Sequence, residues 1–600
     1  MRTATSLVVA AALAASGVVD AADSRTDTVV VTATRTPITA DDALASVTVI
    51  SREDIEQRQA ESLPDLLSGI TGVTVTSQGG VGKLSSLYLR GTNSDHTLIL
   101  VDGVRIGSAT SGRAAIEDIP VSQIQRIEVV RGPRSTLYGA DAVGGVIQIF
   151  TRDAGAHVSG GFGNEGTGEL SAGYGTDFGD GGFSFNASHF TTDGFDATAT
   201  DNFGHEPDRD GYRNNSVSAR THYRLTDDVE INAQFLRAEG HNEFDGTPNT
   251  GDTAQQTVSA KLGWTPSIDF DTSLRVGQSL DDSKNFQNGS DYSRFTSRRD
   301  SASWQANYAF NPANLTTVGV DYYRDRVDAT VDYTETSRRN TGVFLQHQIF
   351  IGDANVQAGL RHDDNEAYGE NTTGSLALGY RVMPELRAYA SYGTAFKAPS
   401  FNDLYWPDEP FFHGNPDLKP EESRTGEIGL AGEGAVHWKL SAYRTVVDDL
   451  IVYDPAAAEM VNVNQAVIDG VEGEVGADLG WADATVGATW LDPRDDDSGN
   501  VLPRRARRSA FLRLNHEMGD AEVGAQARYA GDRYDDPANN TKLDAYTVVD
   551  LTTAVHINPE WIVRGRIGNV FDEDYQTAAT YNTRGRNVFV SLTWQQGGTR

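Results

Sequence analysis

Two blocks of sequence decide the fold of this chain: LYLRGTNSDHTLILVDGVRI at residues 87–106 and RIEVVRGPRSTLYGADAVGGVIQIF at residues 126–150. They belong to a region with three short apolar runs, at residues 97–101, 124–130 and 146–150, which are bounded by glycine, proline or aspartate. Such bounded runs are typical of buried strands joined by tight turns. The turn signals are Asp102-Gly103 and Arg131-Gly132-Pro133.

This small apolar unit contains five arginines: Arg90, Arg105, Arg126, Arg131 and Arg134. A guanidinium group is costly to bury unless carboxylate or carbonyl oxygens pair with it. We therefore expect each arginine to have such partners or to face a wetted wall.

Four motifs in this region are together highly specific: Leu89-Arg90-Gly91, Val101-Asp102-Gly103-Val104, IEVVRGP at residues 127–133, and LYGADAVGGVI at residues 137–147. The pattern resembles the plug domain of TonB-dependent outer-membrane receptors. The resemblance implies an N-terminal α+β plug, expected at residues 41–153, inside a transmembrane β-barrel. The alternative is a small soluble α+β domain with arginine pairs, and the rest of the chain must decide between them.

The composition narrows the function classes. The chain has 600 residues, a net charge of −34 and no cysteine, and its pI is about 4.6. A strongly acidic chain is a poor partner for nucleic acid. Without cysteine, neither disulfides nor thiolate metal sites are possible.

The first residues resemble a secretory signal peptide. Arg2 precedes an apolar stretch at residues 7–19, and Val19-Asp20-Ala21 offers small residues for cleavage, so residues 1–21 are expected to be removed. Elsewhere no run of about 18 apolar residues occurs, and the mean hydropathy is −0.42. A helical membrane protein is thereby excluded, but a β-barrel is not, because its lipid face uses only every second residue.

A short β-prone segment follows, expected within a coupling strand and linker at residues 22–40. In the resemblance it corresponds to the TonB box, which would bind the TonB energy-coupling protein by adding a strand to that partner's exposed sheet edge. An ordinary edge strand is the alternative. The residues are Asp27, Thr28, Val29, Val30, Val31, Thr32 and Ala33.

Within the plug region, the sequence predicts a strand at residues 47–50 and a helix that begins after Ser51, which is suited to cap it. The glycine-rich segment 78–83 is not a phosphate-binding loop, because the leading glycine is missing and Leu84 stands where Ser or Thr would bind magnesium. We expect a flexible plug loop there.

Beyond residue 153 the pattern changes to long alternation of apolar and polar residues, with turns rich in glycine and aspartate, up to Trp594. Such alternation gives each strand one apolar and one polar face. A soluble sandwich would alternate too, but roughly 440 residues with few helical patterns and with aromatics near strand ends favour an outer-membrane barrel. One example has Val217, Ala219, Thr221, Tyr223 and Leu225 on one face and Ser218, Arg220, His222 and Arg224 on the other.

The barrel resemblance rests on SYGTAFKAP at residues 391–399, GNPDLKPE at 414–421 and IGNVFDEDY at 567–575. The family implies 22 antiparallel strands, here within residues 154–600, and so an all-β membrane protein of the Gram-negative outer membrane, in contact with its lipid and lipopolysaccharide. Members of the family usually end on an aromatic residue, whereas here residues 595–600 follow Trp594.

Within the family, the sequence is most similar to receptors for cobalamin (vitamin B12). The matching plug stretch is GGVGKLSS at residues 79–86 with RGTN at 90–93. A corrinoid rim carries neutral amides, so hydroxyls and carboxamides suit it better than strong charge. Contacts carry over to Leu84, Ser86, Asn93, Thr110 and Ser111 in the plug and to Gly246, Thr296, Arg505 and Tyr534 in the barrel, where plain residues of the lumen wall are the alternative.

A second feature is a dense set of acids in two segments. Residues 206–211 imitate the opening of an EF-hand loop, but the twelfth position is Val217 rather than glutamate, so this is not an EF-hand. Crowded carboxylates repel one another unless a cation lies between them, and the set resembles the calcium loops of cobalamin receptors. The implied ligands are Asp196, Glu206, Asp208, Asp210, Phe244 through its carbonyl, Asp245 and Asp252.

The sequence thus favours TonB-dependent transport of cobalamin, with calcium as a structural ion. A TonB-dependent iron–siderophore receptor is the alternative of the same class. An outer-membrane enzyme or adhesin is the alternative of another class, but the chain shows no nucleophile elbow, zinc helix motif or catalytic dyad spacing. We therefore expect no enzymatic activity.

Overall fold

The computed structural model describes residues 29–40, 42–153, 155–409, 412–454, 457–463 and 465–597. The predicted signal peptide, and Asp27 and Thr28 of the predicted coupling strand, lie outside these ranges. Within them, no helix has both the length and the apolar character needed to cross a membrane.

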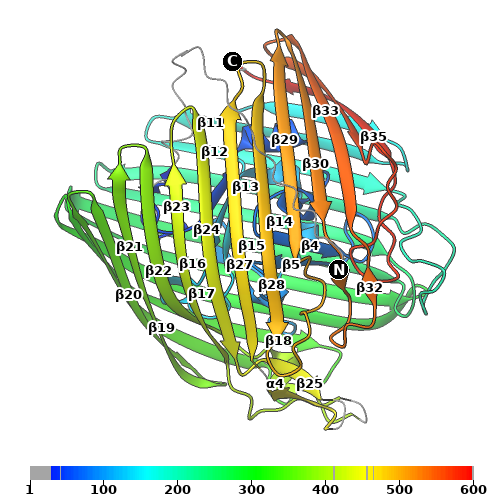
Figure 1. Ribbon diagram of the computed structural model, residues 1–600, viewed down its shortest axis with the longest axis horizontal. Helices are drawn as coiled ribbons and strands as arrows, with labels where there is room; N and C mark the ends of the chain where they lie inside the picture. The colour runs from blue at the N-terminus through cyan, green and yellow to red at the C-terminus, as the bar shows by residue number, and fades with distance from the viewer. Residues whose placement is uncertain are drawn as a thin grey trace, which may run out of the picture.

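Most of the described chain forms a closed antiparallel barrel of 22 strands around an N-terminal domain (Figure 1). This confirms the predicted barrel filled by a plug. The barrel strands are β10 (His157–Gly163), β11 (Gly168–Phe178), β12 (Gly181–Thr192), β13 (Tyr212–Thr226), β14 (Val229–Glu243), β15 (Thr250–Ser267), β16 (Phe270–Gln287), β17 (Ser290–Asn311), β18 (Asn314–Ala329), β19 (Ser337–Ile351), β20 (Ala354–Asn365), β21 (Gly369–Met383), β22 (Leu386–Lys397), β23 (Glu421–Gly432), β24 (Val436–Asp448), β27 (Ala466–Asp478), β28 (Asp483–Asp495), β29 (Arg508–Met518), β30 (Ala521–Ala530), β33 (Tyr546–Asn558), β34 (Trp561–Gly568) and β35 (Asn587–Gln595).

The last strand closes the barrel. β35 pairs with β10, and Trp594 lies opposite Val158 in that register. The ladder continues one residue past Trp594, because Gln595 still pairs with His157.

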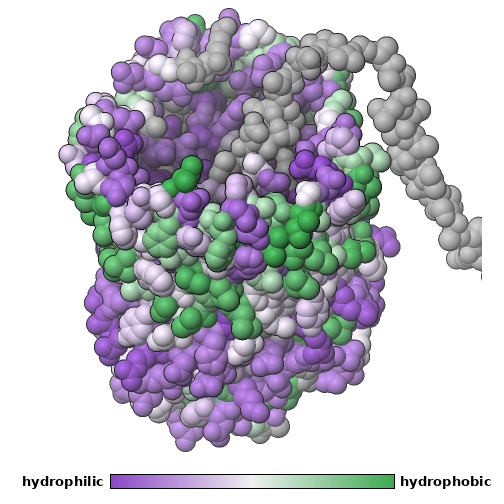
Figure 2. Space-filling view, turned by 90° about the vertical axis from the view of Figure 1, so that its left-hand side faces the viewer, coloured by the Kyte–Doolittle hydropathy of each residue, from purple (hydrophilic) through white to green (hydrophobic). Residues whose placement is uncertain are grey.

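The alternation predicted for residues 217–225 is present in β13. Ser218 is buried and donates to Gln123 of the inner domain at 2.6 Å, whereas Tyr223 on the other face is exposed. Across the visible face of the barrel, apolar side chains form a band around its middle, between two polar ends (Figure 2). Since an outer-membrane barrel has an apolar outer band and a polar interior, this surface fits a lipid bilayer.

The two ends of the barrel differ. At one end strands are joined by tight turns, such as residues 179–180 between β11 and β12. At the other end lie long connections such as residues 193–211, 244–249 and 398–420, the last of which carries α4 at the bottom of Figure 1. These long connections carry α4 (Phe401–Tyr405) and the small strands β25 (Ile451–Asp454), β26 (Glu459–Asn462), β31 (Arg533–Tyr534) and β32 (Lys542–Leu543).

The inner domain is the plug. Its sheet has the order β3-β8-β9-β6-β7, and β4–β5 is a separate hairpin. The elements are β1 (Val29–Val30), β2 (Ile38–Thr39), β3 (Val47–Ile50), α1 (Arg52–Arg58), α2 (Leu63–Ser68), β4 (Val73–Ser77), β5 (Ser85–Leu89), η1 (Ser94–His96), β6 (Thr97–Val101), β7 (Val104–Arg105), η2 (Ile116–Asp118), η3 (Val121–Gln123), β8 (Ile124–Arg131), α3 (Ser135–Tyr138) and β9 (Gly145–Thr151).

The plug elements agree closely with the sequence. The three predicted apolar runs form β6, β8 and β9, which pair in one sheet. Ser51 caps α1 in a reciprocal capping box with Asp54. The turn at Asp102 and Gly103 has positive φ at both residues, which is why aspartate and glycine stand there.

Candidate functional site at the plug apex

A buried ion-pair network fixes the plug to one side of the barrel wall. Arg90 lies 2.9 Å from Glu427 of β23 and 3.1 Å from Glu472 of β27, and Arg131 lies 3.3 Å from the same Glu472. All four side chains are buried. We call this group the Arg90 latch. It shows that two of the plug's buried arginines find their carboxylates on the barrel.

The other three plug arginines have partners within the plug, as expected. Arg105 pairs with Asp141 and donates to a carbonyl at 3.1 Å. Arg126 pairs with Glu128 at 2.8 Å, and Arg134 donates to the Pro133 carbonyl at 3.1 Å. The plug arginines are therefore explained by the ion pairs and hydrogen bonds that they form within the protein, and no catalytic role is needed to account for them.

The glycine-rich segment 78–83 is a loop at the long-loop end of the plug, as predicted, and its lysine is anchored. Lys83 donates to the carbonyls of Gly211 at 3.1 Å and Glu243 at 2.6 Å, and to the Asn242 side chain at 2.6 Å. Burial, opposed in part by the carboxylates of Asp210, Glu243 and Asp245, lowers the pKa of the Lys83 ammonium to about 8. This lysine joins the plug loop to the bases of both acidic connections.

Two predicted cobalamin contacts meet directly. Arg505 donates to the side-chain oxygen of Asn93 and to the Gly91 carbonyl, and its guanidinium lies 4.4 Å from the ring centroid of Tyr88. Arg505 is buried by these contacts. Its charge is thus used to hold the plug apex, and Asn93 keeps its amide group as a donor.

A second contact region surrounds Thr110. Its neighbour Ala109 donates to Ser297 of β17 at 2.9 Å, and the Thr110 carbonyl accepts from Asn402 of α4 at 3.0 Å. Around it, aromatic rings pack on Ala109, including Phe401. This cluster positions the apical turn of residues 108–113 against the barrel wall.

The remaining predicted contacts lie at different depths. Leu84 and Ser111 are exposed, and Ser86 is half-buried, so all three plug residues are accessible at the apex. Gly246 is in the acidic connection, with φ +101 and the Gly204 backbone next to it. Tyr534 lines a cavity of about 240 Å³ together with Arg505.

Thr296 is a predicted contact whose side chain the structure turns away from the plug. Neighbouring strand residues point to opposite faces, and Ser297 is the residue that bonds the plug. Thr296 instead donates to Asp282 at 2.6 Å, beside the exposed Arg294–Asp282 pair. It is therefore not brought together with the plug residues.

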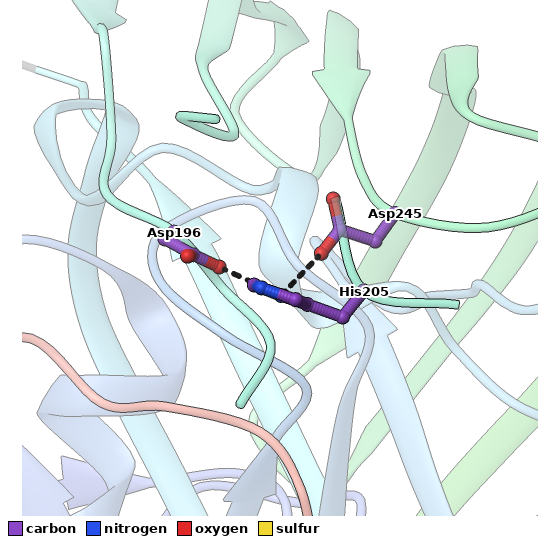
Figure 3. Close-up of side chains that lie close together, drawn as sticks. All are labelled: Asp196, His205 and Asp245. Carbon is purple, nitrogen blue, oxygen red and sulfur yellow. Dashed lines mark ion pairs between the residues drawn. The ribbon is translucent and has the colours of Figure 1, made fainter. Parts of the chain in front are cut away.

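Five of the predicted calcium ligands converge in the connections β12–β13 and β14–β15: Asp196, Glu206, Asp208, Asp210 and Asp245. Asp196, His205 and Asp245 form one group, and Glu206, Asp208 and Asp245 form another, with the ligand atoms of each group within 4.8 Å of one another. Figure 3 shows His205 between the two carboxylates of the first group. Asp245 belongs to both groups, so the two are adjacent.

Asp210 is the fifth of these converging ligands. Its carboxylate accepts from the Ala197 amide at 2.8 Å. Burial, together with the nearby carboxylates of Asp245 and Asp208, raises the pKa of the Asp210 carboxyl to about 6. The arrangement is therefore one in which carboxylates crowd one another.

The other two predicted ligands stand apart from the convergence. Asp252 pairs with His241 at 2.7 Å across the β14–β15 ladder. The amide of Phe244 donates to the Asn249 carbonyl at 3.0 Å, which closes the connection at its base.

The described part of the predicted coupling strand, residues 29–33, packs on the plug. Val30 pairs with Ile38 in the β1–β2 hairpin. Thr32 donates to Glu128 at 2.6 Å, and its carbonyl accepts from Tyr138 at 3.0 Å. Only Val29–Val30 of this segment are in a strand, and residues 31–33 turn against the plug, so a partner that pairs with the segment must first displace these contacts.

Three residues that sequence reasoning did not single out as site residues belong to this site: Lys83, His205 and Thr198, whose hydroxyl contacts His205 at 3.1 Å and donates to Asp245. Lys83 had a visible signal, since a lysine in a glycine-rich apical loop needs acceptors. His205 had one as well, because it immediately precedes Glu206 in the acidic segment. Thr198 had none, because an isolated threonine carries no pattern.

Comparisons with known proteins agree with this architecture. The family model described as "TonB dependent receptor-like, beta-barrel" matches residues 155–570, and "TonB-dependent Receptor Plug Domain" matches residues 39–146. The chain is 36% identical over 590 residues to the vitamin B12 transporter BtuB of Photobacterium profundum, covering 96% of each. It is 34% identical over 597 residues to the vitamin B12 transporter BtuB of Vibrio vulnificus, covering 95% of each.

A solved structure of similar fold is the ferric enterobactin receptor PfeA of Pseudomonas aeruginosa, with a TM-score of 0.80 over 95% of this chain and 100% of that one. At 19% identity this likeness shows the fold alone. With plug and barrel both matched, the chain belongs to the TonB-dependent receptors, transport proteins of the outer membrane that are not enzymes.

Proposed function

We propose that this receptor imports cobalamin into the periplasm, driven by TonB, with calcium ordering its extracellular acidic connections. The observation that carries the substrate is the similarity, end to end, to two vitamin B12 transporters at 36% and 34% identity. The plug apex is consistent with it, since Leu84, Ser86, Asn93 and Ser111 offer neutral groups there. Neutral amide-rich ligands are bound by such hydroxyl and carboxamide groups.

A ferric siderophore is the alternative substrate, and the arginines near the apex argue against an anionic one. Arg504 is paired with Asp535 at 2.8 Å. Arg505 is occupied by Asn93 and the Gly91 carbonyl. An anionic ligand would have to compete with these partners for the guanidinium groups.

Calcium fits the residues of the acidic connections. It accepts six to eight oxygen ligands in flexible geometry, and carboxylates from two connections can share it. Glu206, Asp208 and Asp245 supply such oxygens, and Asp210 lies beside Asp245. Bound calcium would supply the positive charge that lets these carboxylates approach, while the chain's own contacts, above all those of Lys83, hold the two connections near each other.

A titration tests the substrate. Purified receptor is titrated with cyanocobalamin in millimolar calcium and in chelator, with a ferric catecholate siderophore as competitor. We expect saturable cobalamin binding that the siderophore leaves unchanged. Siderophore binding without cobalamin binding would replace this proposal by the alternative.

The coupling role of residues 27–33 is tested separately by Val30→Pro. Proline removes a backbone donor and so blocks strand pairing with a partner. We expect cobalamin binding to persist in the purified variant and uptake by cells to fail, whereas Val30→Thr, which keeps the donor, should support uptake. Normal uptake by the proline variant would reject this segment as the coupling strand.

A further inference from the structure

His205 introduces an imidazole into a set of groups that otherwise consists of oxygens. Its Nδ1 lies 3.6 Å from a carboxylate oxygen of Asp196 and 4.0 Å from one of Asp245 (Figure 3). The two aspartates come from different connections, β12–β13 and β14–β15, so the imidazole stands between two parts of the extracellular face.

Neither separation is a hydrogen bond, since such bonds have donor–acceptor distances of about 2.7–3.2 Å. The imidazole Nδ1 of His205 lies at hydrogen-bond distance, 3.1 Å, from Thr198 Oγ1, and that hydroxyl also donates to Asp245. The three metal-ligating groups therefore converge without bonding one another, at a spacing that an inserted cation would bridge.

The spacing suits a small cation. Ligand atoms that lie about 2.0–2.1 Å from a tetrahedral zinc ion lie about 3.3 Å from one another. The imidazole closes from 3.6 Å and 4.0 Å by shifts of a few tenths of an ångström at each side chain, and all three ligand atoms already lie within 4.8 Å of one another. The Asp245 side chain is 2% exposed and that of Asp196 is 39% exposed, so the site has a buried floor and an open entrance.

The surrounding backbone is held in place by contacts outside the group. The Ala197 amide donates to Asp210 at 2.8 Å. The Asn582 side chain donates to the carbonyls of Asp196 and Thr198, at 3.0 Å and 2.9 Å. Asp196 is thus presented from a braced segment, which is what a preformed ligand needs.

The donor set selects the cation class. Imidazole nitrogen suits zinc and other first-row transition metals, whereas calcium takes oxygen ligands. We propose that Asp196, His205 and Asp245 form a site for a zinc-type divalent cation, distinct from the oxygen-only group of Glu206, Asp208 and Asp245. The Asp245 carboxylate belongs to both groups, so the two sites are adjacent.

The proposed site consists of these three residues, and it bears on the proposed function through its effect on cobalamin binding. It rests on that function only where it states an effect on cobalamin: a zinc-type ion would tie the two connections together as calcium is proposed to do. Metal binding itself is measured without any corrinoid, so the two proposals fail separately.

The test uses the full-length receptor, stripped of metal and titrated with Zn²⁺ alone and with Ca²⁺ alone. The central variant is His205→Asn, because asparagine removes the nitrogen ligand but keeps an oxygen near the same place. We expect it to weaken zinc binding by at least about tenfold, since even indirect ligand support is worth about 10–100-fold. Calcium affinity should change less than about twofold. Glu206→Gln with Asp208→Asn should show the reverse.

The control is His222→Asn. His222 lies 3.7 Å from Asp177, and both are exposed; among the described residues this pair belongs to no group of three or more ligating side chains that could hold a metal. It should alter neither affinity. Co²⁺ serves as a spectroscopic probe: the wild type and His222→Asn should give the same visible absorption, and His205→Asn should lose it.

Equal zinc affinities for the wild type and His205→Asn would overturn the proposal, as would a Co²⁺ spectrum that the variant leaves unchanged. Heat-modifiable migration in gels verifies that each variant is folded. If zinc binds as expected and calcium does not bind the wild type, this site stands and the calcium part of the proposed function fails.

Discussion

The Arg90 latch and the acidic connections both concentrate charge, but they balance it differently. In the latch, Arg90 and Arg131 face Glu427 and Glu472 at 2.9–3.3 Å, all buried. In the connections, several carboxylates share one lysine and one histidine. The comparison teaches that matched charge marks a joint within the protein, whereas unmatched charge marks a place where something from outside completes the set.

This contrast has a mechanical side. Lys83 is a point where the plug touches the acidic connections, because its ammonium donates to the carbonyls at their base. A plug that moves during transport must withdraw this ammonium or carry the connections with it. The latch and Lys83 therefore hold opposite faces of one plug.

The largest expected effect comes from breaking the latch. Arg90→Met leaves Glu427 and Glu472 buried with less compensation, which we expect to cost about 3–5 kcal/mol of plug stability. The measurement is the denaturant midpoint of plug unfolding, with hydrogen exchange in β5 and β8. Arg237→Met removes an exposed pair with Glu239 and should cost at most about 1 kcal/mol. Similar midpoints for the two variants would show that the latch is not a joint.

The acidic connections should respond to metal. Calcium is expected to tighten cobalamin binding by roughly 5–150-fold, equivalent to about 1–3 kcal/mol of coupling. By linkage, bound cobalamin must tighten calcium by the same factor. The measurement compares cobalamin affinity in chelator and in millimolar calcium, and Glu206→Gln with Asp208→Asn should remove the difference. Equal affinities for the wild type would reject the mechanism, even with calcium bound.

Lys83→Met tests the link between the plug and the acidic connections. Removing the ammonium leaves the Gly211 and Glu243 carbonyls and the Asn242 side chain without their donor, which we expect to cost about 1–3 kcal/mol of local stability. Hydrogen exchange of residues 208–211 and 243–245 should accelerate. Lys284→Met, which removes an exposed pair with Asp291, should leave exchange there unchanged. Unaltered exchange in Lys83→Met would mean that the connections are held by other contacts.

The sequence predicted the fold well because its signals are local. Short apolar runs became β6, β8 and β9, and alternation became the barrel wall, since period-two patterning specifies strand faces without knowledge of the partner strand. The site was predicted less completely. Asn93 and Arg505 are 412 positions apart in sequence, so their contact is a product of plug insertion that no local pattern encodes.

Thr296 shows the physical limit most clearly. A shift of one residue along a strand moves a side chain to the other face, so Ser297 bonds the plug whereas Thr296, one position before it, bonds Asp282 instead. His205 shows the converse. The acidic residues near His205 form a visible pattern in the sequence, but only the folded connections place its imidazole opposite Asp245.

The smallest expected effect concerns the neutral apex, which carries neither matched nor unmatched charge. Ser86→Ala with Ser111→Ala removes two hydroxyls that we expect to contact amide groups of cobalamin, each worth about 0.5–1.5 kcal/mol. The affinity of purified receptor for cyanocobalamin should fall accordingly, with plug stability unchanged because neither residue belongs to the latch. Ser111→Thr keeps a hydroxyl at an exposed position and should bind as the wild type does. Unchanged affinity in the double variant would place the ligand elsewhere on the apex, nearer Asn93 and Arg505. Replacing Asn93 is a less specific test, because it also removes a partner of the buried Arg505 guanidinium and so gives a larger loss.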